Sequence, residues 1–282
     1  MSRIIKKAGR FEVHIPQQFT CDRPAVHFTR AEHVSSVVEH PLYGTLPKDT
    51  TFPYVLDIPE KHCRELSGPE APKGFHDFDT TDRPALSLHV ITFSDCTFVT
   101  LTYLHCLTDG MGRRELVVNW SRVLRGDKNS VSPVAGPVND PAAQISSMQK
   151  SGLDEDYLWQ HKMLSGFSLL LFFCYFLGDI LFGPRNRQRT VVVPAAFVAC
   201  LREEAYKDGS CLTLSDGDIL TAWLVRLTCS HIPSSSRRSL AIGSAIDPRG
   251  RVPASIIDPN TAYISNLVVH AWTLTTANEF LG

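Results

Sequence analysis

The clearest alternation of apolar and polar residues lies between residues 86 and 105. Two runs, 86–93 and 96–104, are rich in β-branched and aromatic residues, and Ser94-Asp95 between them is typical of a tight turn. A period of two puts four residues on one face of the second run: Val99, Leu101, Tyr103 and His105. This pattern predicts a β-hairpin with His105 at the end of its second strand.

Two stretches instead follow a helical period. The first apolar stripe comprises Leu116, Val117, Trp120, Val123 and Leu124, and Gly126 is a good stop signal. The second comprises Ile219, Leu220, Trp223, Leu224 and Leu227. Ser215 is a candidate N-cap, with Asp218 at the capping-box position. We therefore expect helices over about 110–125 and 215–229, with Asp109 near the entry of the first.

The remaining chain has weaker patterns. Residues 1–80 predict loops with a few short elements, and residues 126–160 predict a surface loop without periodicity. Strands are expected at 191–193, 240–246 and 262–273, with a short helix after Pro194.

Residues 163–183 form the most apolar segment. Its uncharged part, 163–178, has about 16 residues, fewer than the roughly 20 that span a bilayer. Arg185, Arg187 and Arg189 follow directly. We expect a helix that is buried or lies on a membrane surface, with a transmembrane span as the alternative. The arginines fit a solvated surface or an anionic membrane face.

Composition narrows the classes of protein. The 282 residues suffice for two domains, and 43% hydrophobic with 20% charged residues indicates a folded globular protein. The net charge of −1 argues against a nucleic-acid partner. The basic N-terminus leads into no apolar run, so we expect no signal peptide. The eight cysteines form no C-x-x-C pair, which favours reduced thiols in the cytoplasm over disulfides or zinc.

His105 is the strongest candidate for chemistry. A histidine titrates near pH 6.5 and can accept a proton at neutral pH, so at a strand end it suits a general base. The alternative is a core histidine bonded to a backbone carbonyl. Asp109 could orient the imidazole, bind a metal or form an ion pair. The strand-to-helix break argues against a shared metal, and a carboxylate at a turn more often pairs with arginine or caps the helix.

Cys106 offers a rival mechanism, a Cys–His nucleophilic hydrolase. Neighbouring residues of a strand point to opposite faces, so Cys106 and His105 would not readily meet. We expect Cys106 to be a small core residue. Gly110 and Gly112 permit close backbone approach.

The run His105-Cys-Leu-Thr-Asp109-Gly110 resembles the His-x-x-x-Asp-Gly signature of BAHD-type acyltransferases, particularly fungal ones. Three further stretches resemble the family in its order: 215–223 a helix, 245–251 an Asp-x-Arg-Gly stretch, and 263–266 a Tyr-x-Gly-Asn stretch in which Ser265 replaces glycine. Condensation domains and chloramphenicol acetyltransferases share His-x-x-x-Asp. Condensation domains usually carry a second histidine where this chain has Leu104.

The resemblance implies an α/β (α+β) fold of the chloramphenicol acetyltransferase-like type, with two lobes of mixed sheet and helices. Residues 1–189 would form the N-terminal lobe, and 190–282 would begin a second lobe that is incomplete. His105 would be the general base in a channel between the lobes. Asp109 would pair with Arg249, and Gly110 would shape the same turn. Further channel residues would be Tyr103, Thr108 and Asn266.

The resemblance also implies the substrates. An acyl-CoA co-substrate would donate an acyl group to a hydroxyl or amine of a small molecule of secondary metabolism, in a monomer without bound cofactor or metal. The family's Asp-Phe-Gly-Trp-Gly motif is absent before Gly282. The chain is therefore expected to be a fragment, or an inactive descendant or interaction module that contacts a membrane surface through 163–189.

Overall fold

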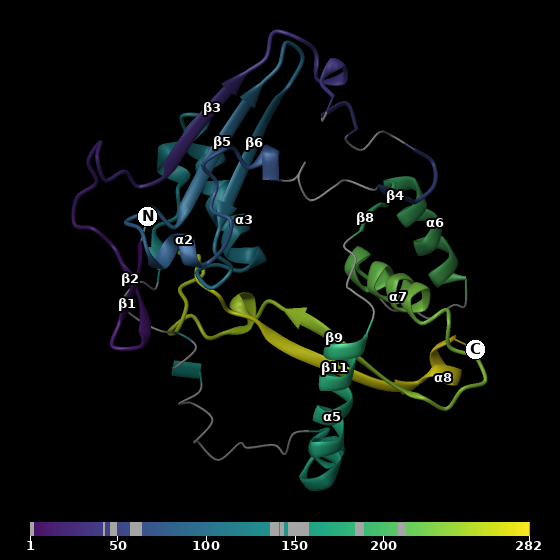
Figure 1. The fold of residues 1–282 in the computed structure, drawn as a ribbon. Helices are drawn as coiled ribbons and strands as arrows, with labels where there is room; N and C mark the ends of the chain where they lie inside the picture. The colour runs from purple at the N-terminus through teal and green to yellow at the C-terminus, as the bar shows by residue number, and fades with distance from the viewer. Residues whose placement is uncertain are drawn as a thin grey trace.

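A computed structural model gives the fold of the chain (Figure 1). It describes residues 3–41, 43–45, 50–56, 64–135, 141, 144–145, 158–183, 189–207 and 213–281. Several sequence predictions concern residues outside these ranges: Arg185, Arg187, Gly282 and much of the expected loop 126–160.

A three-stranded sheet carries the predicted hairpin. Its strands are β3 (His27–Glu32), β5 (Leu86–Thr92) and β6 (Thr97–Tyr103), in the order β3-β5-β6. β3 is parallel to β5, whereas β5 and β6 are antiparallel. The N–H of Phe93 donates to the carbonyl of Cys96 at 2.8 Å and closes the turn at Ser94-Asp95. The hairpin expected from the period of two is confirmed.

The two faces of this sheet bury different groups. Leu86 and Leu88 of β5 lie opposite Tyr103 and Leu101 of β6, and this face is turned toward helix α3 (Gly110–Leu124). On the other face Ile91 and Phe93 pack with Tyr43 in a buried cluster. Leu116, Val117, Trp120 and Val123 of the predicted α3 stripe lie toward the sheet, although Val117 and Val123 stay partly open to solvent, and Leu124 is the most exposed of the five. Gly126, with φ at 82°, follows the helix end as expected.

Four smaller pairs of strands surround this unit. They are β1 (Arg3–Lys7) with β2 (Arg10–His14), β4 (Tyr54–Leu56) with β8 (Thr190–Val192), β7 (Val134–Ala135) with β10 (Ala262–Tyr263), and β9 (Ser239–Ile246) with β11 (Val269–Thr276). β7 corrects the expectation of an unbroken loop over 126–160, because a distant strand pairs with it. β4–β8 and β7–β10 join residues on both sides of position 189, where the sequence predicts a lobe boundary.

Two helices, α6 (Ala195–Tyr206) and α7 (Asp216–Thr228), lie together at the right of Figure 1. α6 packs on α7, with the rings of Phe197 and Trp223 at 5.7 Å. Ser215 caps α7 and forms the predicted capping box with Asp218. Short helices of the described ranges include α2 (His76–Asp79) and α8 (Ala277–Leu281). There are also 3-10 turns at Val37–Glu39, Tyr43–Thr45, Lys128–Ser130, Gln160–Lys162 and Arg249–Arg251.

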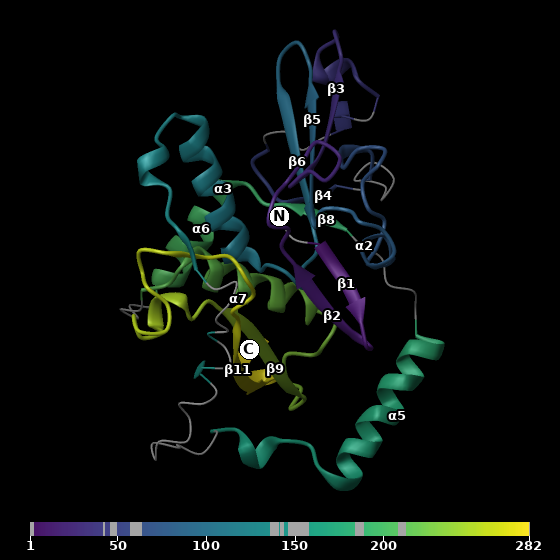
Figure 2. The ribbon, with the colours of Figure 1, turned by 90° about the vertical axis from the view of Figure 1, so that its left-hand side faces the viewer.

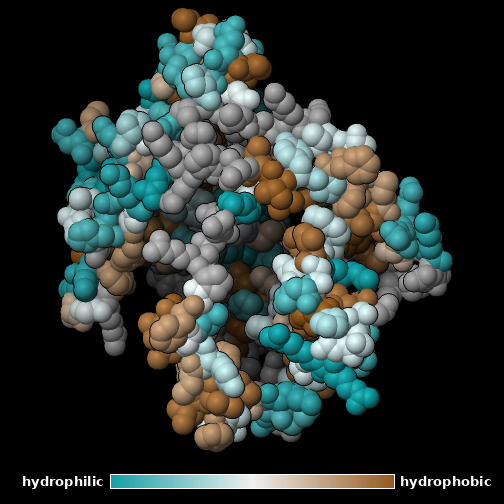
Figure 3. All heavy atoms as spheres, turned by 45° about the vertical axis from the view of Figure 1, so that its right-hand side comes forward, coloured by the Kyte–Doolittle hydropathy of each residue, from teal (hydrophilic) through white to brown (hydrophobic). Residues whose placement is uncertain are grey.

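The apolar segment forms helix α5 (Gly166–Phe182), which projects from the rest of the chain (Figures 1 and 2). The helix is as predicted, and of the two placements expected for it burial does not hold, since none of its 17 residues is buried. Apolar side chains gather at this end of the molecule in Figure 3. Among the described residues no helix has the length and apolar character that crossing a membrane requires.

Candidate acyl-transfer site

His105 lies just beyond the end of β6, at the position expected for it. The strand ends at Tyr103, and a turn follows in which the N–H of Leu107 donates to the carbonyl of Leu104 at 3.0 Å. The side chain is exposed, so the alternative of a core histidine does not hold. Because the strand ends first, the period of two does not extend to His105. Its backbone is fixed from the second half of the chain, since Asn266 Nδ2 donates to the His105 carbonyl at 2.8 Å.

Asp109 occupies the N-cap of α3. One carboxylate oxygen accepts the N–H of Gly112 at 2.8 Å and the other accepts the N–H of Leu267 at 2.7 Å. Only 3% of its side chain is exposed. A carboxylate suits this position because it satisfies a free N–H of the first turn and faces the positive end of the helix dipole. Asp109 thereby joins the first turn of α3 to the segment that follows β10.

Arg249 supplies the positive charge that pairs with the Asp109 carboxylate. Its Nη2 donates to both oxygens of Asp109, at 3.0 and 2.9 Å, which confirms the ion pair expected from the sequence. The same guanidinium donates to the carbonyls of Ser265 at 2.6 Å and Tyr263 at 3.1 Å, and to a carboxylate oxygen of Asp247 at 2.7 Å. With 11% of its side chain exposed, Arg249 has its donors satisfied inside the protein.

The pKa values of the pair follow from these contacts. Burial alone would raise the pKa of Asp109, but the hydrogen bonds from Gly112 and Leu267 and the charge of Arg249 outweigh it and hold that pKa below its ordinary value. Burial opposes the charge of Arg249 too, yet its bonds to Asp109 and Asp247 raise its pKa. Both groups are therefore charged at neutral pH. Asp109 is an ionised carboxylate and carries no proton that it could donate to a substrate.

The two glycines of the motif differ. A Cβ atom on Gly112 would overlap the carbonyl of Ile264 and the hydroxyl of Thr108, whereas one on Gly110 would meet open space. The close approach of backbone that the sequence suggested is thus required at Gly112. Gly110, which the family signature emphasises, has no such steric requirement.

A cavity of about 350 Å³ lies beside the turn. Its wall includes Cys106, Leu107 and Thr108, the three residues after His105, together with Tyr103 and Arg113. Two of the three predicted channel residues, Tyr103 and Thr108, therefore line it. The third, Asn266, instead holds the His105 carbonyl. Sequence reasoning missed Arg113, although it stands four residues after Asp109 and helical spacing could have placed it at the site.

Cys106 is not the core residue expected, because its side chain is exposed at this cavity. The strand had already ended, so alternation no longer decided where it pointed. Desolvation of the sulfur by its neighbours raises the pKa of the thiol. A Cys–His hydrolase needs a thiolate, which this shift disfavours. Across the described residues no group of three His, Cys, Asp or Glu side chains could hold a metal ion.

Comparisons with known proteins give the chain's relatives. No protein-family model matches the chain. It is 33% identical to "Transcriptional regulator calD" of Penicillium decumbens over 96% of this chain and 55% of that protein, and 30% identical to "Acetyltransferase adrJ" of Penicillium rubens over 92% and 53%. The chain thus spans about half the length of the curated relatives it matches.

A solved structure shares the fold. TRI101 of F. sporotrichioides, complexed with coenzyme A and T-2, superposes with a TM-score of 0.52 at 15% identity, over 99% of this chain and 58% of that one. This likeness shows the mixed α/β, chloramphenicol acetyltransferase-like fold. Over the half of those relatives that it spans, the chain is similar to fungal proteins named acetyltransferases and O-acetyltransferases, and it resembles BAHD-type acyltransferases.

Proposed function

We propose that this chain carries the acid–base half of an acyl-CoA-dependent acyltransferase that modifies a hydroxyl or amine of a small molecule in secondary metabolism. The observation that carries the proposal is the placement of His105. Its side chain is exposed at a turn whose backbone is held by Asn266 and by the buried pair of Asp109 and Arg249. The cavity beside that turn, which is lined by Cys106, Leu107 and Thr108 and not by His105 itself, gives a substrate room near the turn.

In the proposed reaction a ring nitrogen of His105 accepts the proton of the acceptor O–H or N–H. The oxygen or nitrogen then attacks the thioester carbonyl of the acyl-CoA, and a new C–O or C–N bond forms. The C–S bond breaks, and the CoA thiolate leaves with the proton from the imidazolium. A base placed in this way contributes about 10²–10⁴-fold to the rate. Asp109 supports the turn without taking part in proton transfer, because Arg249 occupies both of its oxygens.

Relatives and fold support the substrate class. Several relatives are named acetyltransferases or O-acyltransferases, and the TRI101 structures contain coenzyme A. The scattered cysteines of the sequence support a cytoplasmic site of action. We further propose that the chain acts as a monomer, with acyl-CoA as a co-substrate.

A CoA-release assay tests this proposal. The purified 282-residue chain is incubated with acetyl-CoA and a panel of alcohols and amines, and free thiol is measured over time. We expect acceptor-dependent release from the chain. Release that is absent for every acceptor, from protein shown to be folded, would contradict the proposal that this half of the family fold is active.

One observation favours a second candidate, an interaction role through α5. The helix exposes large apolar side chains along its whole length, among them Phe167, Phe173 and Phe182. At 17 residues it measures about 26 Å, less than a bilayer core of about 30 Å. Contact with a membrane surface over 163–189 would cover this apolar surface without a span. Flotation with anionic vesicles, compared between the chain and its Phe173→Glu variant, tests it, and equal recovery of both would contradict it.

A further inference from the structure

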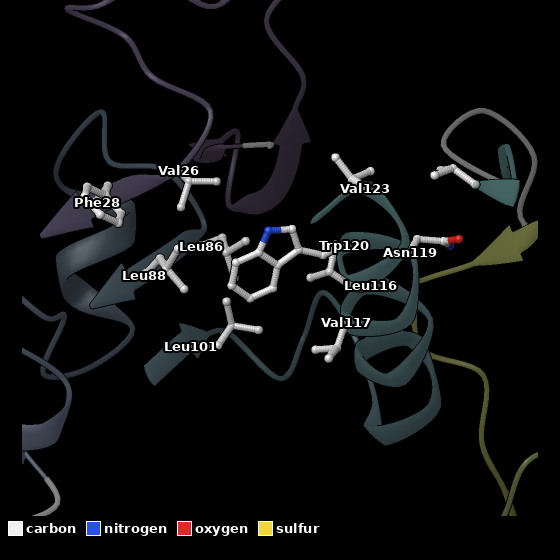
Figure 4. A pocket seen from close by; sticks show the side chains of 11 residues that line it. Val26, Phe28, Leu86, Leu88, Leu101, Leu116, Val117, Asn119, Trp120 and Val123 are labelled. Atoms are coloured by element: carbon white, nitrogen blue, oxygen red, sulfur yellow. The ribbon is translucent and has the colours of Figure 1, made fainter. Parts of the chain in front are cut away.

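A second cavity lies on the same sheet face as the cavity beside His105. It sits between β5 and β6 on one side and α3 on the other, and its volume is about 350 Å³ (Figure 4). The indole of Trp120 projects from α3 toward Leu86, Leu88 and Leu101 at the middle of this space. The cavity is thus a product of the packing of α3 on the hairpin.

The wall of this second cavity is almost wholly hydrocarbon. Its polar side-chain groups are the indole N–H of Trp120 and the amide of Asn119, and the Asn119 Oδ1 is already engaged. It accepts from Arg122 Nη1 at 3.0 Å and from the N–H of Ser132 at 3.2 Å. A hydroxyl or charged group of a ligand would lose its hydrogen bonds to water on entering this cavity, and the wall would not replace all of them. Burying such a group therefore costs free energy. Apart from the indole N–H and the Asn119 amide the wall is hydrocarbon, and it therefore favours an apolar group.

The two cavities adjoin. Leu86, Leu101 and Leu116 line both of them, so the side chains shared between the surroundings of Cys106 and Thr108 and the space around Trp120 are apolar. An acetyl group has too few atoms to reach across these shared leucines. A polyhydroxylated acceptor would lose its hydrogen bonds there, and the phosphates of CoA would be excluded still more strongly.

We propose that the cavity around Trp120 binds the aliphatic tail of an acyl group longer than acetyl, and so sets the chain length that the enzyme accepts. The proposal rests on the transfer site at His105 proposed above. With the carbonyl carbon beside the turn, the tail runs past Leu101 and Leu116 and ends against Trp120. Each buried methylene adds favourable transfer free energy, so affinity should rise with chain length until the cavity is filled.

Two measurements on the full chain separate this inference from the proposed function. The first is calorimetric titration with decanoic acid, which reports on the cavity without any turnover. We expect binding with a negative heat-capacity change, the mark of apolar burial. The second is CoA release from decanoyl-CoA against acetyl-CoA with one acceptor, where we expect a lower KM for decanoyl-CoA.

Variants that fill the cavity supply the critical comparison. Leu88→Trp closes it from the sheet and Val123→Trp closes it from α3, so one remains informative if the other fails to fold. Each should weaken the binding of decanoic acid by about tenfold or more, which corresponds to the transfer free energy of roughly two methylenes kept out of the cavity. Each should leave the kinetics with acetyl-CoA unchanged. Val90→Trp is the matched control, because Val90 lies two residues along the same strand face and does not line the cavity.

The outcomes are distinct. Decanoic acid binding that both filling variants weaken, without CoA release from any donor, supports the cavity and overturns the transferase. Acetyl-CoA turnover without decanoic acid binding supports the transferase and overturns the tail site. Binding that is equal in the chain and in folded filling variants also overturns the tail site.

Discussion

Arg249 donates two hydrogen bonds from one nitrogen to the carboxylate of Asp109, 140 residues earlier in the chain. The contact joins the first turn of α3 to the 3-10 turn after β9. Around it, Tyr263 and Leu267 belong to a buried apolar cluster, and their carbonyls accept from the same guanidinium. The turn that carries His105 is therefore shaped by residues from both halves of the chain.

Replacing Arg249 should be strongly destabilising. Arg249→Met leaves the carboxylate of Asp109 buried without its counter-charge, and breaking one side of a buried pair costs about 3–5 kcal/mol. We expect a loss of that size in the free energy of unfolding, measured by urea denaturation. Arg251→Met, at an exposed position two residues away, serves as the control and should change little. A loss under about 1 kcal/mol for Arg249→Met would show that the pair does not hold the turn.

The same pair predicts a dependence of stability on pH. The pKa of Asp109 is lower in the folded chain than the value of about 3.9 in an unfolded one. Its contribution to stability is thus fully present above that unfolded value and is lost as pH falls through the folded pKa. Unfolding free energies of the chain and of Asp109→Asn, measured from pH 6 to pH 2, should differ most at pH 6 and converge in acid. A difference that stays constant would mean that Asp109 is not charged in the fold.

The two motif glycines should respond in opposite ways to alanine. Gly112→Ala forces a methyl group against the Ile264 carbonyl, and overpacking of this kind costs about 1–3 kcal/mol. Gly110→Ala places its methyl group in open space at the start of α3, where alanine favours the helix. Thermal denaturation of the two variants side by side checks this order. Equal melting temperatures would contradict the close approach of α3 to the segment after β10.

Asn266 should act as a positioning residue. Asn266→Ala removes the bond to the His105 carbonyl and lets the turn shift. Small displacements of a reacting group can cost up to about 10²-fold in rate, so we expect a lower kcat with little change in KM for the acyl-CoA. Steady-state kinetics separate the two constants. A raised KM with unchanged kcat would instead make Asn266 a contact for substrate.

Local patterns predicted the elements whose partners are near in sequence. The hairpin of β5 and β6, the stripe of α3 and the cap of α7 at Ser215 each depend on residues within one element or one turn. The pairing of Asp109 with Arg249 was accessible through the family resemblance, since no local period links positions 140 residues apart.

The misses have a common cause, which is tertiary context. β7 has two residues and forms only because β10 lies beside it. Cys106 was placed in the core by extending the alternation of β6 past Tyr103, where the strand ends. The sequence left open whether α5 is buried or lies on a surface, because an apolar helix gives no face that decides between them. The cavity around Trp120 depends on how α3 packs on the sheet. Sequence periodicity predicts which face of α3 is apolar, but not the space that remains between that face and the sheet.

In the proposed reaction His105 performs the chemistry while Asp109 and Arg249 hold its turn. The most direct test is the rate of acceptor-dependent CoA release by His105→Ala, with the free energy of unfolding measured on the same protein. We expect turnover to fall by about 10²–10⁴-fold with stability unchanged, since the side chain is exposed. Turnover within tenfold of the unaltered chain, or a loss of activity that follows a loss of fold, would contradict the assignment of His105 as the base.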